Sequence, residues 1–163
     1  MPRHHDVGMM TTRNAGTGGA AFGRGGMPCL TRIQPSGARW CWSSEDEKAI
    51  GQLIADAISD EPGFTAIHVA GAAAALEATK HVIPDVLVLD VRLPGMNGFE
   101  LYDHLLRQPR TAHIPVLFET ANTGDAAEEF RRRGIATFVR KPFDLWDVVS
   151  YVKRLAQGVP LTS

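Results

Sequence analysis

The segment VLVLDVRLPGMNG, at residues 86–98, is the strongest structural signal in this chain of 163 residues. Its first four residues form a continuous apolar run, which is typical of a central parallel strand that is covered on both faces. The run ends at Asp90, and the turn-forming residues Pro94, Gly95, Asn97 and Gly98 follow it. This order predicts a buried strand with a carboxylate at its carboxyl end.

Helical and strand patterns alternate on both sides of this segment. Residues 47–59 have helical spacing, and Ile50, Leu53, Ile54, Ala57 and Ile58 are expected to form one buried stripe. Further helices are predicted at 71–80, 99–106, 125–133 and 145–155, and further strands at 65–70, 116–118 and 136–139. Such alternation requires crossover connections, so we predict a doubly wound α/β domain with a parallel sheet.

The composition indicates a soluble globular protein. Hydrophobic residues make up 44% and charged residues 21%, which argues against wholesale disorder. The net charge of -1 gives no field that would attract nucleic acid, and the basic run at 131–133 is expected to be a solvated helix end. No apolar run approaches the roughly 20 residues that span a bilayer. Two cysteines provide no disulfide framework, so we expect a cytoplasmic setting without membrane contact.

The chain divides into a domain and two flanking segments. Residues 1–37 are rich in glycine, arginine, threonine and proline and show no hydrophobic period, so we predict a disordered or artefactual extension. The domain is predicted at 38–157, and a short tail at 158–163. Because so few residues follow Ala156, we expect a stand-alone domain whose output is another protein.

The candidate site residues lie where the predicted strands end. Asp90 ends one strand, Thr120 the next and Lys141 the last, while Glu45 and Asp46 precede the first helix. The carboxyl ends of parallel strands share one edge of the sheet, so these side chains are expected to converge. They suit phosphoryl transfer to Asp90 as the nucleophile, with Mg²⁺ on the three carboxylates. Lys141 and Thr120 would contact the phosphoryl oxygens.

With these motifs the chain resembles the receiver domains of bacterial two-component response regulators, over roughly residues 40–156. Asp90 is followed by Pro94 and Gly98 at the family's spacing. Thr120 and Ala121 match the family's switch hydroxyl motif, and the segment Lys141-Pro142-Phe143 matches its lysine motif. The resemblance implies a five-stranded, flavodoxin-like parallel sheet with strand order 2-1-3-4-5.

The resemblance also implies a function. Asp90 would accept a phosphoryl group, with Mg²⁺, from a histidine kinase or a histidine phosphotransfer protein, and the backbone carbonyl of Arg92 would complete the metal ligands. Thr120 would then move toward the phosphoryl group, with Phe138 as the coupled aromatic switch residue, while Arg92 and Asn122 flank the site. The repacked face at 125–155 would select a downstream protein target. Such a protein is a signalling domain, monomeric or weakly dimeric, and no metabolic enzyme.

The predicted first strand departs from the family, because residues 38–44 read ARWCWSS where an aliphatic run is usual. If residues 39–44 were encoded CGG-TGG-TGC-TGG-TCG-TCG, a shifted frame would read Val-Val-Leu-Val-Val, so we hypothesise a frameshift upstream of Glu45. The nucleotide sequence tests this. The departure leaves open a pseudo-receiver that binds proteins without taking up phosphate. An α/β phosphatase is less favoured, because Arg92 stands where such enzymes usually carry a second aspartate.

Each predicted site residue could also have an ordinary structural role. Asp90 could cap a helix, Glu45 and Asp46 could simply favour a helix N-terminus, and Lys141 could be a solvated lysine. The first and third roles are disfavoured by the motif spacing, whereas the second is compatible with metal binding.

Overall fold

The computed structural model describes residues 39–45, 47–121 and 124–159. The predicted extension at 1–37, Asp46 and Asn122 therefore lie outside the described residues. The strands are β1 (Arg39–Ser44), β2 (Phe64–His68), β3 (Val86–Asp90), β4 (Val116–Thr120) and β5 (Phe138–Arg140). The helices are α1 (Lys48–Ser59), α2 (Gly71–Thr79), α3 (Gly98–Leu106), α4 (Gly124–Arg133) and α5 (Leu145–Ala156).

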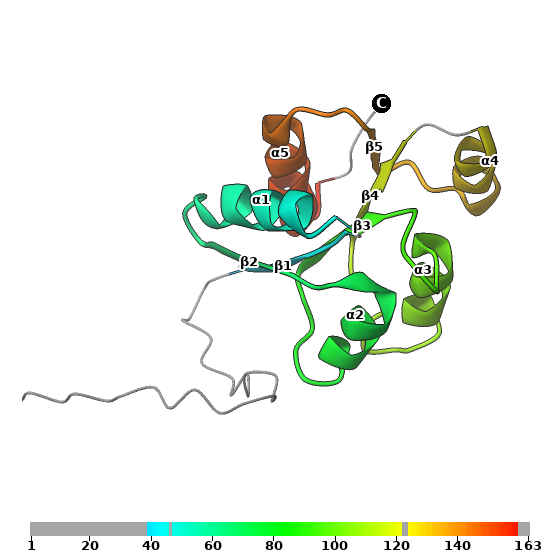
Figure 1. Cartoon of the computed structure of the whole chain (residues 1–163). Coiled ribbons are helices and arrows are strands. Elements are labelled where there is room, and N and C mark those ends of the chain that lie inside the picture. The colour runs from blue at the N-terminus through cyan, green and yellow to red at the C-terminus, as the bar shows by residue number, and fades with distance from the viewer. Residues whose placement is uncertain (1–38, 46, 122–123, 160–163) are drawn as a thin grey trace, which may run out of the picture.

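The five strands form one parallel sheet in the order β2-β1-β3-β4-β5, which confirms the predicted topology. Helices α1 and α5 pack together on one face of the sheet, and α2 and α3 pack on the other (Figure 1). This arrangement follows from right-handed crossovers between parallel strands. It brings the carboxyl ends of β1, β3, β4 and β5 to one edge, where the candidate residues are found.

Strand β3 is the centre of the core, and all five of its residues are buried. Leu87 and Leu89 face a cluster that includes the aromatic ring of Phe118, whereas Val86 and Val88 face the valines of α5. Burying one such aliphatic side chain contributes about 1.5–3 kcal/mol relative to exposure. The strand is therefore a rigid support for Asp90 at its end.

Helix α1 buries Ile54 and Ile58 as predicted, and Ile50 and Ala57 pack partly buried against the same core cluster. Gly51, Ile54, Ala55 and Ile58 are its buried residues, and Leu53, which we expected in the core, is 53% exposed. The prediction for Leu53 was wrong because the stripe is centred one residue away. The helix is turned so that Gly51 lies against β2, where a Cβ atom would come within 2.1 Å of the His68 ring.

Residues 39–44 do form an interior strand of the sheet, β1, between β2 and β3, despite their unfavourable composition. The strand nevertheless buries four side-chain polar atoms that have no hydrogen-bond partner: Trp40 Nε1, Trp42 Nε1, Ser43 Oγ and Ser44 Oγ. Each such group costs about 1–3 kcal/mol in desolvation. The sequence is thus poorly matched to this position, and the frameshift remains a hypothesis that only the nucleotide sequence tests.

The placement of β1 makes a prediction for Cys41, whose side chain is 1% exposed. Burial, together with the nearby carboxylates of Asp85 and Glu119, raises the pKa of the Cys41 thiol far above its ordinary value. Because the thiolate is the reactive form, we expect Cys41 to resist iodoacetamide in the native protein and to react in denaturant. Peptide mapping separates it from Cys29, and rapid native alkylation of Cys41 would contradict the placement of this strand.

Candidate functional site

Three carboxyl groups lie at one level of the sheet, on three neighbouring strands. Asp90 at the end of β3 is the register partner of Glu119 on β4. Ser44 of β1 pairs with Leu89, so Glu45, the next residue, comes level with Asp90. All three side chains are buried. Three acids this close together repel one another unless a proton or a cation compensates.

The compensating cation is Lys141, which follows β5. Its Nζ atom donates hydrogen bonds to Glu45 Oε2 and Asp90 Oδ2, both at 2.6 Å. The distance from Nζ to Glu119 Oε2 is 3.7 Å, which is an ion-pair contact without a hydrogen bond. The structure therefore brings Glu45, Asp90 and Lys141 together as the sequence predicted. It adds Glu119, which was not predicted as a site residue.

The pKa values in the cluster move in opposite directions. Burial raises the pKa of Glu119 to about 9, and Glu45 adds to the rise. Burial and Glu45 also raise the pKa of Asp90 above its ordinary value, against the lowering effect of Lys141. For Glu45, burial is outweighed by hydrogen bonds from Glu119, Asp90 and Lys141, so its pKa is lowered. At neutral pH, Glu119 is therefore the acid that keeps a proton.

This shift predicts how stability depends on pH in metal-free buffer. Glu119 has an ordinary pKa of 4.5 and a pKa of about 9 in the folded protein. Between these values the folded state holds more protons than the unfolded state, so the free energy of unfolding falls as pH rises. One proton gives a slope of about 1.4 kcal/mol per pH unit. Glu119→Gln should flatten this slope in denaturant titrations with EDTA.

The exposed Glu128 provides the matched control for that experiment, because its side chain is 73% exposed. Glu128→Gln should leave the slope unchanged. Equal slopes for the wild-type protein and Glu119→Gln would contradict the assignment of the proton to Glu119.

The carboxylate of Asp90 is also oriented by the loop that follows it. Asp90 Oδ1 accepts a hydrogen bond of 2.8 Å from the backbone N–H of Arg92. The loop then turns back, because the N–H of Gly98 donates to the carbonyl of Val91 at 2.9 Å. Helix α3 begins there, and Asn97 and Glu100 close its first turn as a capping box. One Asp90 oxygen thus faces the loop while the other faces Lys141.

Thr120 and Phe138, the two predicted switch residues, occupy different surroundings. Thr120 is buried at the end of β4, and its carbonyl accepts a 2.7 Å hydrogen bond from the N–H of Lys141. The ring of Phe138 is stacked on that of Phe130 in α4, with centroids 4.5 Å apart. The ring of Phe130 in turn contacts Phe118 and Phe99. Phe138 is therefore joined to α4 by direct aromatic packing.

The site's chemistry fits a hard divalent cation. Glu45 and Asp90 each place an oxygen 2.6 Å from the same ammonium nitrogen, so these two oxygens converge. Mg²⁺ in proteins commonly uses one or two carboxylates, with the remaining positions filled by waters and phosphate. Within the ranges that the structure describes, no three acidic, histidine or cysteine side chains form a complete metal-binding group. Asp46 lies outside those ranges, as stated above.

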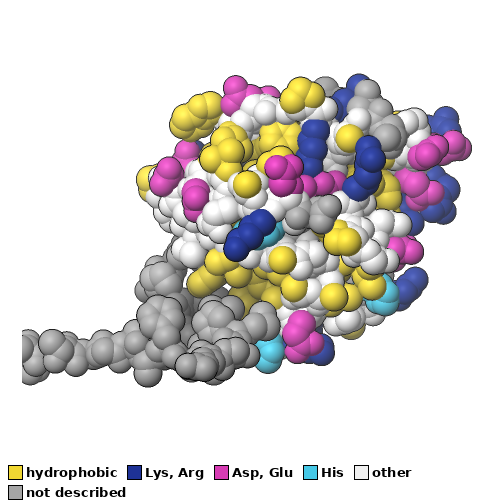
Figure 2. Space-filling model, in the orientation of Figure 1, with side chains coloured by type: hydrophobic (Ala, Val, Ile, Leu, Met, Phe, Trp, Pro, Cys, Tyr) yellow, Lys and Arg dark blue, Asp and Glu magenta, His cyan; other side chains and the backbone are white. Residues whose placement is uncertain are grey.

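The other charged and hollow regions are distinct from this cluster. The basic run of α4 is paired with acids, through the contacts Arg131–Glu128 and Arg132–Glu129, and Figure 2 shows charges of both signs over this helix.

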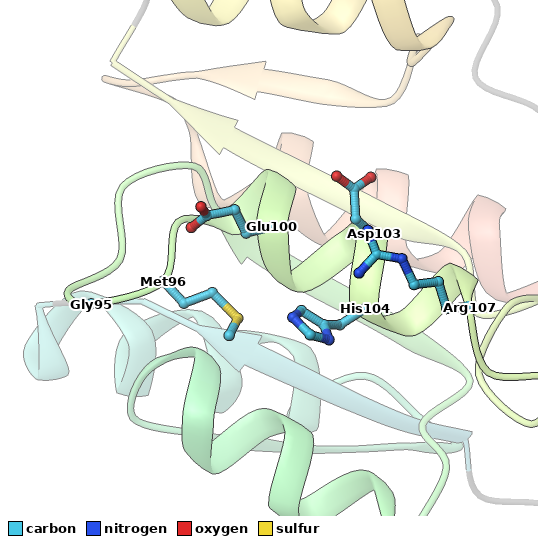
Figure 3. A pocket seen from close by; sticks show the side chains of 6 residues that line it. All are labelled: Gly95, Met96, Glu100, Asp103, His104 and Arg107. Atoms are coloured by element: carbon cyan, nitrogen blue, oxygen red, sulfur yellow. The ribbon is translucent and has the colours of Figure 1, made fainter.

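A hollow of about 380 Å³ lies along α3, and Figure 3 shows its lining from the β3–α3 loop and α3. No helix in the described part of the chain is long and apolar enough to cross a membrane.

Comparison with known proteins identifies relatives of this arrangement. The family model described as response regulator receiver domain matches residues 43–153. The chain is 34% identical, over 116 residues, to the DNA-binding transcriptional regulator NtrC of Escherichia coli K12. The aligned region covers 69% of this chain and 24% of that protein. It is also 34% identical to the phosphate regulon transcriptional regulatory protein PhoB of Rhizobium meliloti, over 68% of this chain and 49% of that protein.

Solved structures give the same result for the fold. The signal receiver domain of a histidine kinase from Syntrophus aciditrophicus has a TM-score of 0.67 and 28% identity, over 77% of this chain and 96% of that one. The chemotaxis response regulator CheY4 of Vibrio cholerae has a TM-score of 0.65 and 23% identity, over 72% and 98%. The chain spans about a quarter to a half of the length of the curated relatives named above.

Proposed function

Because this chain belongs to the response regulator receiver domain family, we propose that it accepts a phosphoryl group on Asp90 and signals through a changed protein-binding face. The observation that carries the proposal is the pair of 2.6 Å hydrogen bonds from Lys141 to Glu45 and Asp90. A buried carboxylate at a strand end, with a cation in contact, is suited to attack on phosphorus.

The proposed reaction is a displacement at phosphorus. One oxygen of Asp90 forms a bond to the phosphorus atom of a phosphohistidine, and the phosphorus–nitrogen bond of the donor breaks with its electron pair left on the imidazole. Lys141 places positive charge beside the transferred oxygens. Glu45, Asp46, Asp90 and the backbone carbonyl of Arg92 would hold Mg²⁺, which when bound would neutralise negative charge on the phosphoryl group.

The proposed response begins at Thr120. Its hydroxyl donates a hydrogen bond to the new phosphoryl oxygens, and β4 and β5 adjust around it. Phe138 is the next member of the path, because its ring packs on Phe130 of α4. A change at Phe138 therefore alters the seating of α4, and through it the face that a downstream protein contacts.

We propose the remaining properties on the same basis. The receiver unit comprises residues 38–157, works in the cytoplasm, and receives its phosphoryl group from a histidine kinase or a histidine phosphotransfer protein. Its signal leaves through contact with another protein, and its oligomeric state is a monomer or a weak dimer. Direct contact with nucleic acid forms no part of the proposal, because the basic side chains of α4 are paired with acids.

A second candidate function is a pseudo-receiver that binds proteins without phosphorylation. The unpartnered buried atoms of β1 favour it, because Ser43 and Ser44 directly precede Glu45. A strand that relaxes to satisfy these hydroxyls would displace Glu45 from Lys141.

The two functions differ in one measurement. The wild-type protein is incubated with acetyl phosphate and Mg²⁺, and its intact mass is then measured by mass spectrometry. The receiver proposal predicts the mass increase of one phosphoryl group, which excess EDTA prevents. An unchanged mass in Mg²⁺ would favour the pseudo-receiver.

A further inference from the structure

Glu119 is a buried acid that the proposed reaction does not use. It belongs to β4, directly before Thr120, and its side chain is 1% exposed. As a carboxylate it has no hydrogen-bond donor at either oxygen, and as the neutral acid it is hydrogen-bonded to Glu45. A buried carboxylate without a donor destabilises the fold. Its carboxyl group nevertheless points into the cluster, because Oε2 lies 3.7 Å from the Nζ atom of Lys141.

The ammonium group of Lys141 donates its two short hydrogen bonds to carboxylates other than Glu119. Lys141 Nζ carries three N–H donors, and it donates to Glu45 and Asp90, both at 2.6 Å. A divalent cation held by Glu45 and Asp90 would compete with the ammonium for these carboxylates. If Glu45 and Asp90 turn their oxygens to a cation, Lys141 loses both acceptors and also experiences repulsion from the added positive charge.

We propose that Glu119 is a positioning residue for Lys141. Its carboxyl group accepts a hydrogen bond from the Lys141 ammonium when Glu45 and Asp90 coordinate a divalent cation. The inference rests on the proposed function and goes beyond it, since it assigns a role to a residue outside the predicted site. Closing the gap from 3.7 Å to hydrogen-bond distance requires a movement of about 1 Å, which rotation of two long side chains supplies.

The surroundings of Glu119 suit this role. Strand β4 holds it between β3 and β5, where its register partners are Asp90 and Val139. Its position is therefore fixed by the sheet and does not depend on a loop. Both the carboxylate and the carbonyl oxygen of the neutral acid accept a hydrogen bond from an ammonium, so the contact forms in either protonation state.

The consequence is a link between Glu119 and cation affinity that acts through Lys141. Without Glu119, binding leaves a half-buried ammonium with no acceptor among the described carboxyl groups of the cluster. A hydrogen bond to a charged group is worth enough to change a dissociation constant about tenfold. Glu119→Leu should therefore weaken Mg²⁺ binding roughly tenfold, and Glu119→Gln by less, because its amide oxygen still accepts.

The test is a double-mutant cycle measured by calorimetric titration with Mg²⁺ alone, without phosphoryl donor. The proteins are the wild type, Glu119→Leu, Lys141→Met and the double variant. We expect the Glu119 substitution to weaken binding in the wild-type background and to have little effect beside Lys141→Met. An equal loss in both backgrounds would overturn the inference, since Glu119 would then act on the cation directly.

Other results are also decisive. Unchanged or tighter Mg²⁺ binding by Glu119→Leu, with normal binding by the wild type, would overturn the inference and leave the proposed function standing. Absence of Mg²⁺ binding by the wild type would overturn both. Glu128→Gln is the surface control and should bind as the wild type does. If Glu119→Leu does not fold by circular dichroism, Glu119→Met, which is unbranched like glutamate but has no oxygen acceptor, decides, and unchanged affinity there overturns the inference.

Discussion

Asp90→Asn should abolish phosphoryl labelling completely while leaving the fold intact. The amide has nearly the same shape as the carboxylate, and its oxygen can still accept the hydrogen bond that Arg92 N–H gives to Asp90. It lacks the anionic oxygen that must form the bond to phosphorus. The substitution removes one negative charge from a cluster of three buried acids but also the hydrogen bond from Lys141 to Asp90, so we expect a small net change in stability.

The comparison uses acetyl phosphate with Mg²⁺ and intact-mass spectrometry. Asp147→Asn is the matched control, because Asp147 is an exposed aspartate on α5, remote from β3 in the sequence. The control should be labelled like the wild type. Labelling of Asp90→Asn at the wild-type rate would show that another group takes the phosphoryl group.

Gly98→Ala should destabilise the protein by about 2–3 kcal/mol and slow the labelling of Asp90. A Cβ atom on Gly98 would lie 2.3 Å from the carbonyl oxygen of Asp90 and 3.1 Å from the Cα atom of Val91. Both neighbours are backbone, so they cannot move aside as a flexible side chain could. The added methyl must push the start of α3 away from the end of β3, which shifts the phosphoacceptor.

Gly124 is the natural control, since it is also the first residue of a helix and a Cβ atom there meets nothing within 4 Å. Gly124→Ala should be neutral or slightly stabilising. Urea denaturation gives the stability of both variants, and the rate of mass change gives their labelling. Equal stability of the two variants would contradict the close approach of α3 to Asp90.

The sequence predicted the central part of this fold well, for a physical reason. The apolar run before Asp90 can only be satisfied by cover on both faces, and the structure buries every residue of β3. The alternation of patterns then led to a parallel sheet, whose carboxyl edge gathers the residues that end each strand. The contacts among Glu45, Asp90 and Lys141 follow from that topology.

Glu119 was missed because its importance depends on register. The predicted apolar strand ended at residue 118, and the next predicted site residue was Thr120. Only the pairing of Asp90 with Glu119 places this carboxyl group beside the phosphoacceptor. A signal did exist, because a glutamate inside a strand that is expected to be buried on both faces needs a partner.

For Leu53 and β1 the side-chain pattern alone was misleading, because tertiary packing determines the outcome. Leucine at helical spacing suggested a core position, but α1 turns Gly51 toward His68 and leaves Leu53 exposed. In β1, the aromatic and serine residues form a strand because its neighbours β2 and β3 supply the hydrogen-bonding partners on both sides. Local composition could not reveal this.

The central claim is that phosphorylation occurs at Asp90, within reach of Lys141. The most direct test is to phosphorylate the wild-type protein with acetyl phosphate and Mg²⁺, reduce the acyl phosphate with sodium borohydride, and sequence the peptides by tandem mass spectrometry. Reduction converts a phosphorylated aspartate to homoserine. We predict homoserine at position 90 alone, and an unmodified Asp90 with the reduced residue elsewhere would contradict the account.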